Sequence, residues 1–442
     1  MAKGDTLVGA LNGVIGDYLE RRRNDLAVDM SLVHGDRPLP IAGDALRQAY
    51  PAATPKLCLF LHGLCCTEQS WCYPDAPATT YGSQLQQRCG LTPLFLRYNT
   101  GLHISRNGRQ LAELLDQLME AYPTDVAELT LIGHSMGGLL IRSACHYGAE
   151  LEHSWVDTVR RAIYLGVPHG GAPLEKAGGL VSAVLGPIDE PFTKLTRKLL
   201  NLRSDGIKDL RHANLVDQDW EGHDVDASFL SRRVVVPVPD HIEHMAAAGT
   251  LTDSDRHLLA QLLGDAIVRV PSAGGRQATG DGALELPAGG FRVFPGLHHM
   301  ALAHHADVYE QLEAWCGTES ATASPAASQG ADCPVDEAEA TGRAKGVKDL
   351  IQDAVEHGST AVQEVHETVA ARPFRILELI PPIRLPVQGV RLVHDAVVRT
   401  VYSSIRLANR AVGAVADEVI EVSEKEDEAG AEPEKPTGSP KS

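Results

Sequence analysis

Short apolar runs alternate with helical segments over much of this chain. The apolar runs span residues 57–61, 93–97, 128–132, 161–165 and 291–294, with another near 243–248. Residues 105–121 place apolar side chains on one face of a helix, at Leu111, Leu114, Leu115, Leu118 and Met119. Continuous apolar strands separated by amphipathic helices are typical of a mostly parallel sheet flanked by helices. The pattern therefore predicts an α/β domain over residues 51–316.

Other parts of the chain follow different patterns. Residues 1–50 begin with apolar side chains about one helical turn apart, which predicts a helical N-terminal lead-in. Residues 172–232 interrupt the strand and helix alternation inside the α/β domain. We interpret this insertion as a cap, with peripheral structure as the alternative.

The composition changes after residue 316. Residues 317–344 are rich in Ala, Ser, Thr and Glu and are predicted to form a flexible linker. Residues 345–415 carry an apolar stripe at helical spacing, which predicts an amphipathic helical unit. The charged residues 416–442 are expected to form a disordered acidic tail.

A G-x-S-x-G sequence directly follows the apolar run at 128–132. It reads Gly133-His134-Ser135-Met136-Gly137, and apolar residues at helical spacing come after it. A strand, a sharp turn and a helix are the context of a nucleophile elbow, in which the serine hydroxyl stands above the sheet edge. A structural βα turn is the alternative reading of the same residues.

A serine nucleophile needs donors for the developing oxyanion as well as a base. The stretch Leu61-His62-Gly63-Leu64 closes the apolar run at 57–61. A His-Gly pair at such a strand end places the backbone N–H of Leu64 beside the elbow. The second donor would be the N–H of Met136, the residue after the serine.

The acid and the base are expected in the chain order serine, acid, histidine. Asp265 lies in a glycine-containing turn beyond a predicted strand, and its rivals are Asp240, Asp253 and Asp255. The base lies after the last predicted strand, where His299 is preferred to the adjacent His298. His304 and His305 follow closely.

Taken together, these residues resemble the α/β-hydrolase superfamily, and within it the lipases and GPI inositol-deacylase-like esterases. The resemblance covers roughly residues 55–316. It rests on the elbow, the Leu61-His62-Gly63 stretch and three further segments: Val167-Pro168-His169-Gly170-Gly171, Gly264-Asp265-Ala266-Ile267-Val268 and His299-Met300-Ala301-Leu302 leading to Val308-Tyr309. Val167 stands where the family has threonine, and Ala266 where it has glycine. The resemblance implies an α/β-hydrolase fold and a Ser135, Asp265, His299 triad.

Bulk composition narrows the expected partners and location. The chain is 43% hydrophobic and 22% charged with a net charge of −18, which argues against nucleic-acid binding. No apolar run reaches the roughly 20 residues of a membrane-spanning helix, and the start does not resemble a signal peptide. The eight cysteines show no metal-site spacing, so we expect reduced thiols, no metal and a cytoplasmic protein.

The function expected from these features is hydrolysis of a lipophilic carboxylic ester without a cofactor. An acyltransferase or thioesterase with the same triad, and a non-catalytic scaffold, are the alternatives. Six arginines against one glutamate and one aspartate lie between residues 373 and 413. Basic charge beside an apolar stripe suits peripheral contact of residues 345–415 with a membrane or lipid body. Packing of this unit on the hydrolase domain or on a second subunit, as in a homo-oligomer, is the interpretation that we rank first.

Overall fold

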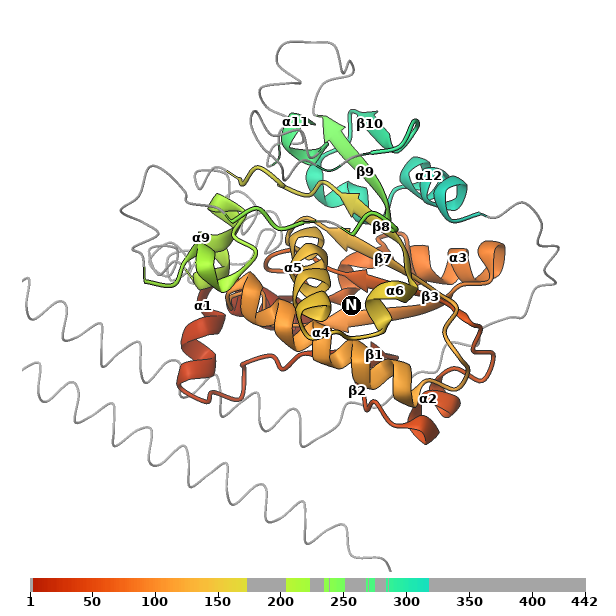
Figure 1. Cartoon of the computed structure of the whole chain (residues 1–442), viewed down its shortest axis with the longest axis horizontal. Helices are drawn as coiled ribbons and strands as arrows, with labels where there is room; N and C mark the ends of the chain where they lie inside the picture. Colours follow the sequence, from red (N-terminus) through yellow and green to blue (C-terminus); the bar gives the residue numbers. More distant parts are fainter. Residues whose placement is uncertain are drawn as a thin grey trace, which may run out of the picture. The chain divides into compact units, whose positions relative to one another are not determined.

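The computed structural model describes residues 3–172, 204–222, 234–237, 239–250, 268, 270–274, 284 and 286–317. Contacts divide the chain into two compact units, Met1–Arg22 with Ala27–Cys333, and Arg23–Leu26 with Pro334–Ser442. The described helices and strands belong to the first unit (Figure 1). The predicted helical unit 345–415 and the tail 416–442 lie outside the described residues, as does the predicted linker 317–344 apart from Gly317.

An eight-stranded sheet in the order β10-β9-β8-β7-β3-β6-β1-β2 forms the centre of this unit. Its strands are β1 (Ser31–His34), β2 (Arg37–Leu39), β3 (Lys56–Leu61), β6 (Thr92–Arg97), β7 (Glu128–His134), β8 (Val159–Leu165), β9 (Glu243–Thr250) and β10 (Phe291–Pro295). The neighbouring pairs from β10 to β6 are parallel, whereas β1 is antiparallel to both β6 and β2. The predicted mostly parallel sheet is confirmed, and its six predicted strands are β3 and β6 to β10.

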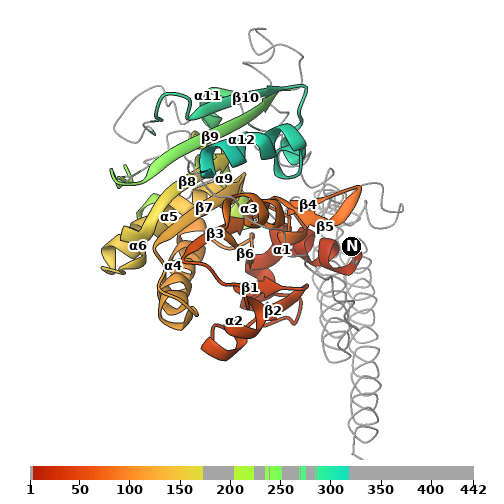
Figure 2. The ribbon, with the colours of Figure 1, turned by 90° about the vertical axis from the view of Figure 1, so that its right-hand side faces the viewer.

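Helices cover both faces of the sheet. One face carries α4 (Ile104–Ala121), α5 (Met136–Glu150) and α6 (Trp155–Thr158), and the other carries α3 (Tyr81–Cys89) and α12 (Ala306–Cys316) (Figure 2). The remaining elements are α1 (Lys3–Arg21), α2 (Gly43–Ala49), η1 (Glu68–Trp71), β4 (Cys72–Tyr73), β5 (Ala76–Thr80), α9 (Asp205–His212), η2 (Asp217–Asp219), α11 (Val270–Ala273) and η3 (His299–Ala303). Within the described residues, no helix is both long and apolar enough to cross a membrane.

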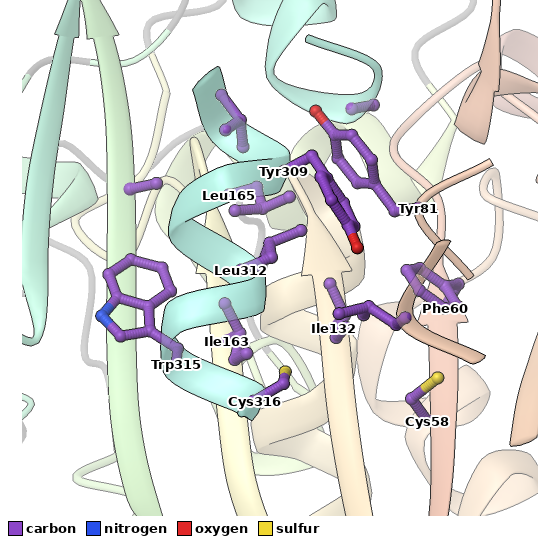
Figure 3. Close-up of a cluster of buried hydrophobic side chains, with 14 of the residues drawn as sticks. Cys58, Phe60, Tyr81, Ile132, Ile163, Leu165, Tyr309, Leu312, Trp315 and Cys316 are labelled. Carbon is purple, nitrogen blue, oxygen red and sulfur yellow. The ribbon is translucent and has the colours of Figure 1, made fainter. Parts of the chain in front are cut away.

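The core is buried between these layers because both sheet faces carry apolar side chains. Cys58 and Phe60 of β3 and Ile132 of β7 pack against the layer of α3 and α12 (Figure 3). Successive side chains of a strand point to opposite faces, so Leu57, Leu59 and Leu61 of β3 face the α4 and α5 layer. Continuous burial of β3 explains why its sequence is an unbroken apolar run.

The prediction of a helical lead-in over residues 1–50 is wrong for its second half. Residues 31–39 form a β1–β2 hairpin at one edge of the sheet, and only α1 and α2 are helical. Gly35 and Asp36 join the two strands with φ of 57° and 64°. Positive φ at both central residues is the backbone of a type I′ hairpin turn. The hydrophobic pattern does not predict these strands because they are short and β2 is largely exposed.

Candidate active site

Ser135 occupies the sharp turn between β7 and α5. Its backbone has φ 53° and ψ −122°, a conformation that non-glycine residues rarely adopt. The Ser135 N–H donates to the carbonyl of Leu165, the last residue of β8, at 2.9 Å. This strand-turn-helix geometry is that of a nucleophile elbow. The predicted local structure around the G-x-S-x-G sequence is therefore present.

The backbone after β3 lies directly against this elbow. A Cβ atom on Gly63 would come within 2.9 Å of Ser135 Cβ and 3.2 Å of His134 Nδ1. A Cβ atom on Gly137 would lie 2.7 Å from the carbonyl oxygen of His62. Only glycine fits such approaches, so these two glycines let the 62–66 loop and the first turn of α5 meet at the serine.

The two residues predicted to supply oxyanion donors, Leu64 and Met136, belong to the loop and to the elbow helix respectively. Leu64 is fully buried in the 62–66 loop, one residue after the Gly63 contact. Met136 is the first residue of α5, and the first N–H groups of a helix have no partner within the helix. The two predicted oxyanion donors therefore belong to segments that pack against each other beside Ser135.

The Ser135 hydroxyl is inside the protein, with 1% of the residue exposed. Its Oγ makes no hydrogen bond with another group of the described residues. A buried hydroxyl without a partner is uncommon in folded proteins and is found where chemistry requires it.

His299 comes from the other end of the chain and lies beside the same elbow. It follows β10, is 1% exposed, and its backbone carbonyl accepts a hydrogen bond from His134 Nε2 at 3.0 Å. The two rings lie 4.8 Å apart between centroids. A Cβ atom on Gly166 would lie 3.1 Å from His299 Nδ1, while Ser135 is bonded to the neighbouring Leu165. Ser135 and His299 thus share the carboxyl end of β8.

The neighbouring histidines His298 and His305 lie at the starts of helices and cap them. His298 is exposed, and its Nδ1 accepts the Ala301 N–H at 3.3 Å to cap η3. His305 caps α12 in the same way, by accepting the Asp307 N–H. Of the two adjacent histidines, His299 is the buried one and the one bonded to the elbow, and its role as the base stays a prediction.

The predicted acid, Asp265, lies outside the described residues, as do its rivals Asp253 and Asp255. Asp240 is described and exposed, and it precedes β9 at the amino end of that strand. Ser135 lies at the carboxyl edge of the parallel sheet, so Asp240 is at the opposite edge. This position removes Asp240 as the partner of His299.

Burial sets the charge state of the groups around the 62–66 loop. The pKa of His62 is lowered to about 3 because the ring is buried, and the ring stacks on Tyr98 at 4.5 Å. His62 is therefore neutral at physiological pH. Burial also raises the pKa of the Cys66 thiol to about 12 and raises that of Cys65 still further. Both cysteines stay protonated, so they pack as apolar side chains in the 62–66 loop.

Part of the predicted cap is described and packs on the segment between β6 and α4. The Gly206 N–H of α9 donates to the Gly101 carbonyl at 3.1 Å, and the Asp209 carboxylate accepts the Ile104 N–H at 2.9 Å. Burial raises the pKa of Asp209, and hydrogen bonds from His103 and from Asn214 oppose that shift. Residues 204–222 therefore pack on the segment after β6. The rest of the predicted cap lies outside the described residues.

The described side chains also include potential metal ligands and cysteines, whose arrangement is as follows. Where the structure is described, His, Cys, Asp and Glu side chains form no group of three or more that could hold a metal ion. The cysteines at 58, 65, 66, 72, 89, 145 and 316 are free thiols.

Two interactions of this site were not foreseen from the sequence. They are the His134–His299 bond and the contact of α1 with the 62–66 loop, where a Cβ atom on Gly13 would lie 2.8 Å from Cys65 Cα. Both join residues distant in the chain, and no local pattern encodes them. A helix with a glycine on its buried face is the one signal that points to a close backbone approach.

The sheet order, the elbow and the loop after β3 together define an α/β-hydrolase fold. Residues 58–246 match the family described as the PGAP1-like alpha/beta domain, which confirms the predicted resemblance over this part of the chain. No curated protein matches the sequence significantly.

Solved structures with a similar arrangement include several esterases and lipases. A lipase-esterase related protein from Clostridium acetobutylicum is 14% identical, covers 65% of this chain and 99% of its own, and has a TM-score of 0.29. The esterase of Pyrococcus furiosus is 13% identical, with 60% and 80% coverage and a TM-score of 0.33. A homologue of hormone-sensitive lipase from a metagenome library is 13% identical, with 72% and 97% coverage and a TM-score of 0.34.

Proposed function

We propose that this chain is a serine hydrolase that cleaves carboxylic esters through an acyl-enzyme on Ser135. The observation that carries the proposal is the position of Ser135. It stands on a strained turn, contacts the 62–66 loop and shares the end of β8 with His299. A base and a pair of oxyanion donors beside a serine are what nucleophilic catalysis by a hydroxyl requires.

In the first step, Ser135 Oγ attacks the ester carbonyl carbon while His299 takes the hydroxyl proton. The N–H groups of Leu64 and Met136 stabilise the negative charge that develops on the carbonyl oxygen. When the tetrahedral intermediate collapses, the bond to the alcohol breaks and the alcohol leaves with the proton from His299. The acyl group remains on Ser135.

In the second step, His299 takes a proton from water, and the resulting hydroxide attacks the acyl carbon. The Ser135 oxygen leaves with that proton, and the carboxylic acid is released. Asp265 is assigned the role of holding the His299 ring in the required tautomer and orientation. The two steps balance with water as the only co-reactant, so no cofactor is called for.

We further propose that the ester is lipophilic and that residues 345–415 contact a membrane or lipid body. That segment has an apolar stripe at helical spacing with arginines beside it, which supports a lipid contact. Flotation with anionic liposomes tests it, with the full chain compared with the chain ended after residue 344. Equal partitioning of the two chains would contradict a lipid contact, and a dimer lost on truncation would favour the second-subunit interpretation.

Hydrolysis of short p-nitrophenyl esters tests the proposed reaction. The Ser135→Ala variant is expected to lose about 10³-fold or more of the parent rate while keeping the same melting temperature. A parent chain that transfers its acyl group to an added alcohol or thiol in preference to water would be an acyltransferase instead. A parent rate equal to that of Ser135→Ala would contradict the proposal and favour a non-catalytic scaffold.

A further inference from the structure

Side chains at and just after the end of β6 form hydrogen bonds with the 62–66 loop and with η1 behind it. Tyr98 Oη donates to the His62 carbonyl at 2.8 Å, and the Cys65 N–H donates to Thr100 Oγ1 at 3.2 Å. A buried ion pair anchors the start of this segment, because Arg97 Nε donates to Glu68 Oε2 at 2.8 Å. Side chains from the end of β6 thus contact successive parts of the loop that carries Leu64.

The two peptide groups that flank Leu64 are each fixed by a hydrogen bond. The carbonyl of the preceding peptide, on Gly63, accepts the Cys66 N–H at 3.2 Å and His62 Nδ1 at 3.1 Å. The N–H of the following peptide, on Cys65, donates to Thr100. Fixing the Gly63 carbonyl directs the Leu64 N–H, at the other end of the same peptide group, in one direction. The Thr100 bond prevents rotation at the next peptide.

The Thr100 hydrogen bond holds Cys65 in an unfavourable backbone conformation. Cys65 has φ 63°, in the left-handed region that favours glycine. Without an acceptor for its N–H, this residue is free to relax to negative φ and to rotate the Leu64 peptide with it. Thr100 and Cys65 are at most 1% exposed, so solvent water does not readily replace the threonine hydroxyl.

We propose that Thr100 is a positioning residue that accepts the Cys65 N–H and thereby sets the direction of the Leu64 oxyanion donor. This inference rests on the proposed function, because it gives Thr100 a role only where an oxyanion forms at Ser135. Thr100 touches neither the substrate nor the reacting atoms and acts through the backbone of the loop.

Substitution of the threonine hydroxyl tests the proposal. Thr100→Val keeps the shape of the side chain but removes the acceptor, whereas Thr100→Ser keeps the acceptor. Thr130→Val is the matched control, since Thr130 is fully buried in β7 and its Oγ1 makes no hydrogen bond in the described part of the chain. The readouts are kcat and KM for an ester, the affinity for a boronic acid that forms a tetrahedral adduct, and the melting temperature.

Thr100→Val is expected to lower kcat by about 10-fold to 100-fold with KM within about twofold of the parent value. Boronate affinity should fall in parallel, and Thr100→Ser should restore both within about threefold. Thr130→Val should leave both unchanged. If Thr100→Val does not fold, Thr100→Cys, which keeps the size but accepts weakly, is expected to give the same pattern.

A Thr100→Val variant with the parent kcat and boronate affinity would overturn this inference but not the proposed function. Equal losses in Thr100→Val and Thr130→Val would do the same. A parent chain that neither hydrolyses esters nor binds the boronate would overturn the proposed function, and the inference with it.

Discussion

His134 Nε2 donates a hydrogen bond to the backbone carbonyl of His299 at 3.0 Å. His134 directly precedes Ser135, so the residue next to the proposed nucleophile holds the backbone of the proposed base. The bond requires a proton on Nε2, because a carbonyl oxygen only accepts. His134 and His299 are 165 positions apart in the chain, and this hydrogen bond joins the end of β7 to the start of η3.

Removal of this bond should misplace the base. His134→Phe keeps an aromatic ring but leaves the His299 carbonyl without the donor, and we expect kcat for ester hydrolysis to fall by about 10-fold or more. His134→Gln, which retains an amide donor, should lose less. Steady-state kinetics with melting temperatures as the control check the expectation. Equal kcat values for the parent and His134→Phe would show that the bond does not position His299.

Gly63 is expected to tolerate no side chain. Gly63→Ala places a Cβ atom 2.9 Å from Ser135 Cβ, so the 62–66 loop must move away from the elbow. Loss of one oxyanion donor lowers kcat by about 10²-fold to 10³-fold in known enzymes, and we expect a loss of that order. Gly43→Ala in α2 is the control, because its nearest neighbour is the flexible end of Arg47 at 3.3 Å. Comparable kcat values in the two variants would contradict this account of the loop.

Substitution of His299 and of His298 should have different effects on activity and on stability. His299→Ala is expected to abolish ester hydrolysis, whereas His298→Ala should keep the parent kcat and lose about 1 kcal/mol of unfolding free energy through its cap of η3. Hydrolysis rates and urea unfolding measure the two effects. Loss of activity in His298→Ala at unchanged stability would move the base to His298.

Substitution of Asp265 and of Asp240 tests which aspartate orients His299. Asp265→Asn should lower kcat by about 10⁴-fold if Asp265 fixes the tautomer of His299. Asp240→Asn should have no effect, because Asp240 is exposed at the opposite edge of the sheet. Full activity in Asp265→Asn would redirect the assignment to Asp253 or Asp255.

Buried neutral histidines should make stability fall as the pH falls. Burial lowers the pKa of His244 from 6.5 to about 4, and Tyr164 lies within 3.1 Å of its Nδ1. Below pH 6.5 the unfolded chain binds a proton that the folded chain refuses, so the contribution of His244 is complete above pH 6.5 and is lost toward pH 4. Each such residue contributes about 1.4 kcal/mol per pH unit in this window.

Urea unfolding at pH 7.5, 6.5 and 5.5 measures this slope. His244→Gln, which keeps a hydrogen-bonding group beside Tyr164, should reduce the slope below pH 6.5 by about 1.4 kcal/mol per unit. The same slope in the parent and in His244→Gln would mean that His244 is protonated in the folded protein.

Much of the sheet could be predicted from sequence because its strands are buried on both faces. The run at 57–61 is an unbroken apolar segment, the run at 128–132 contains Leu129, Leu131 and Ile132, and β3 and β7 occupy the two runs with small extensions. The elbow was predictable for a similar reason, since the turn between β7 and α5 needs small residues at fixed spacing around Ser135.

The missed features depend on contacts between distant segments. The β1–β2 hairpin has few buried side chains, and only the Gly35-Asp36 pair marks its turn. The bond of Cys65 to Thr100 spans 35 positions and uses a threonine that has no distinctive local context. Such interactions are specified by the packing of whole elements, which hydrophobic periodicity does not encode.

Covalent labelling measures directly whether Ser135 is an activated nucleophile. A fluorophosphonate probe phosphonylates a serine that has a base and an oxyanion site beside it, with loss of fluoride. The folded parent chain should label at one site, mapped by mass spectrometry to the peptide that contains Ser135, and both Ser135→Ala and His299→Ala should fail to label. A folded parent chain without label, or label that persists in Ser135→Ala, would contradict the account.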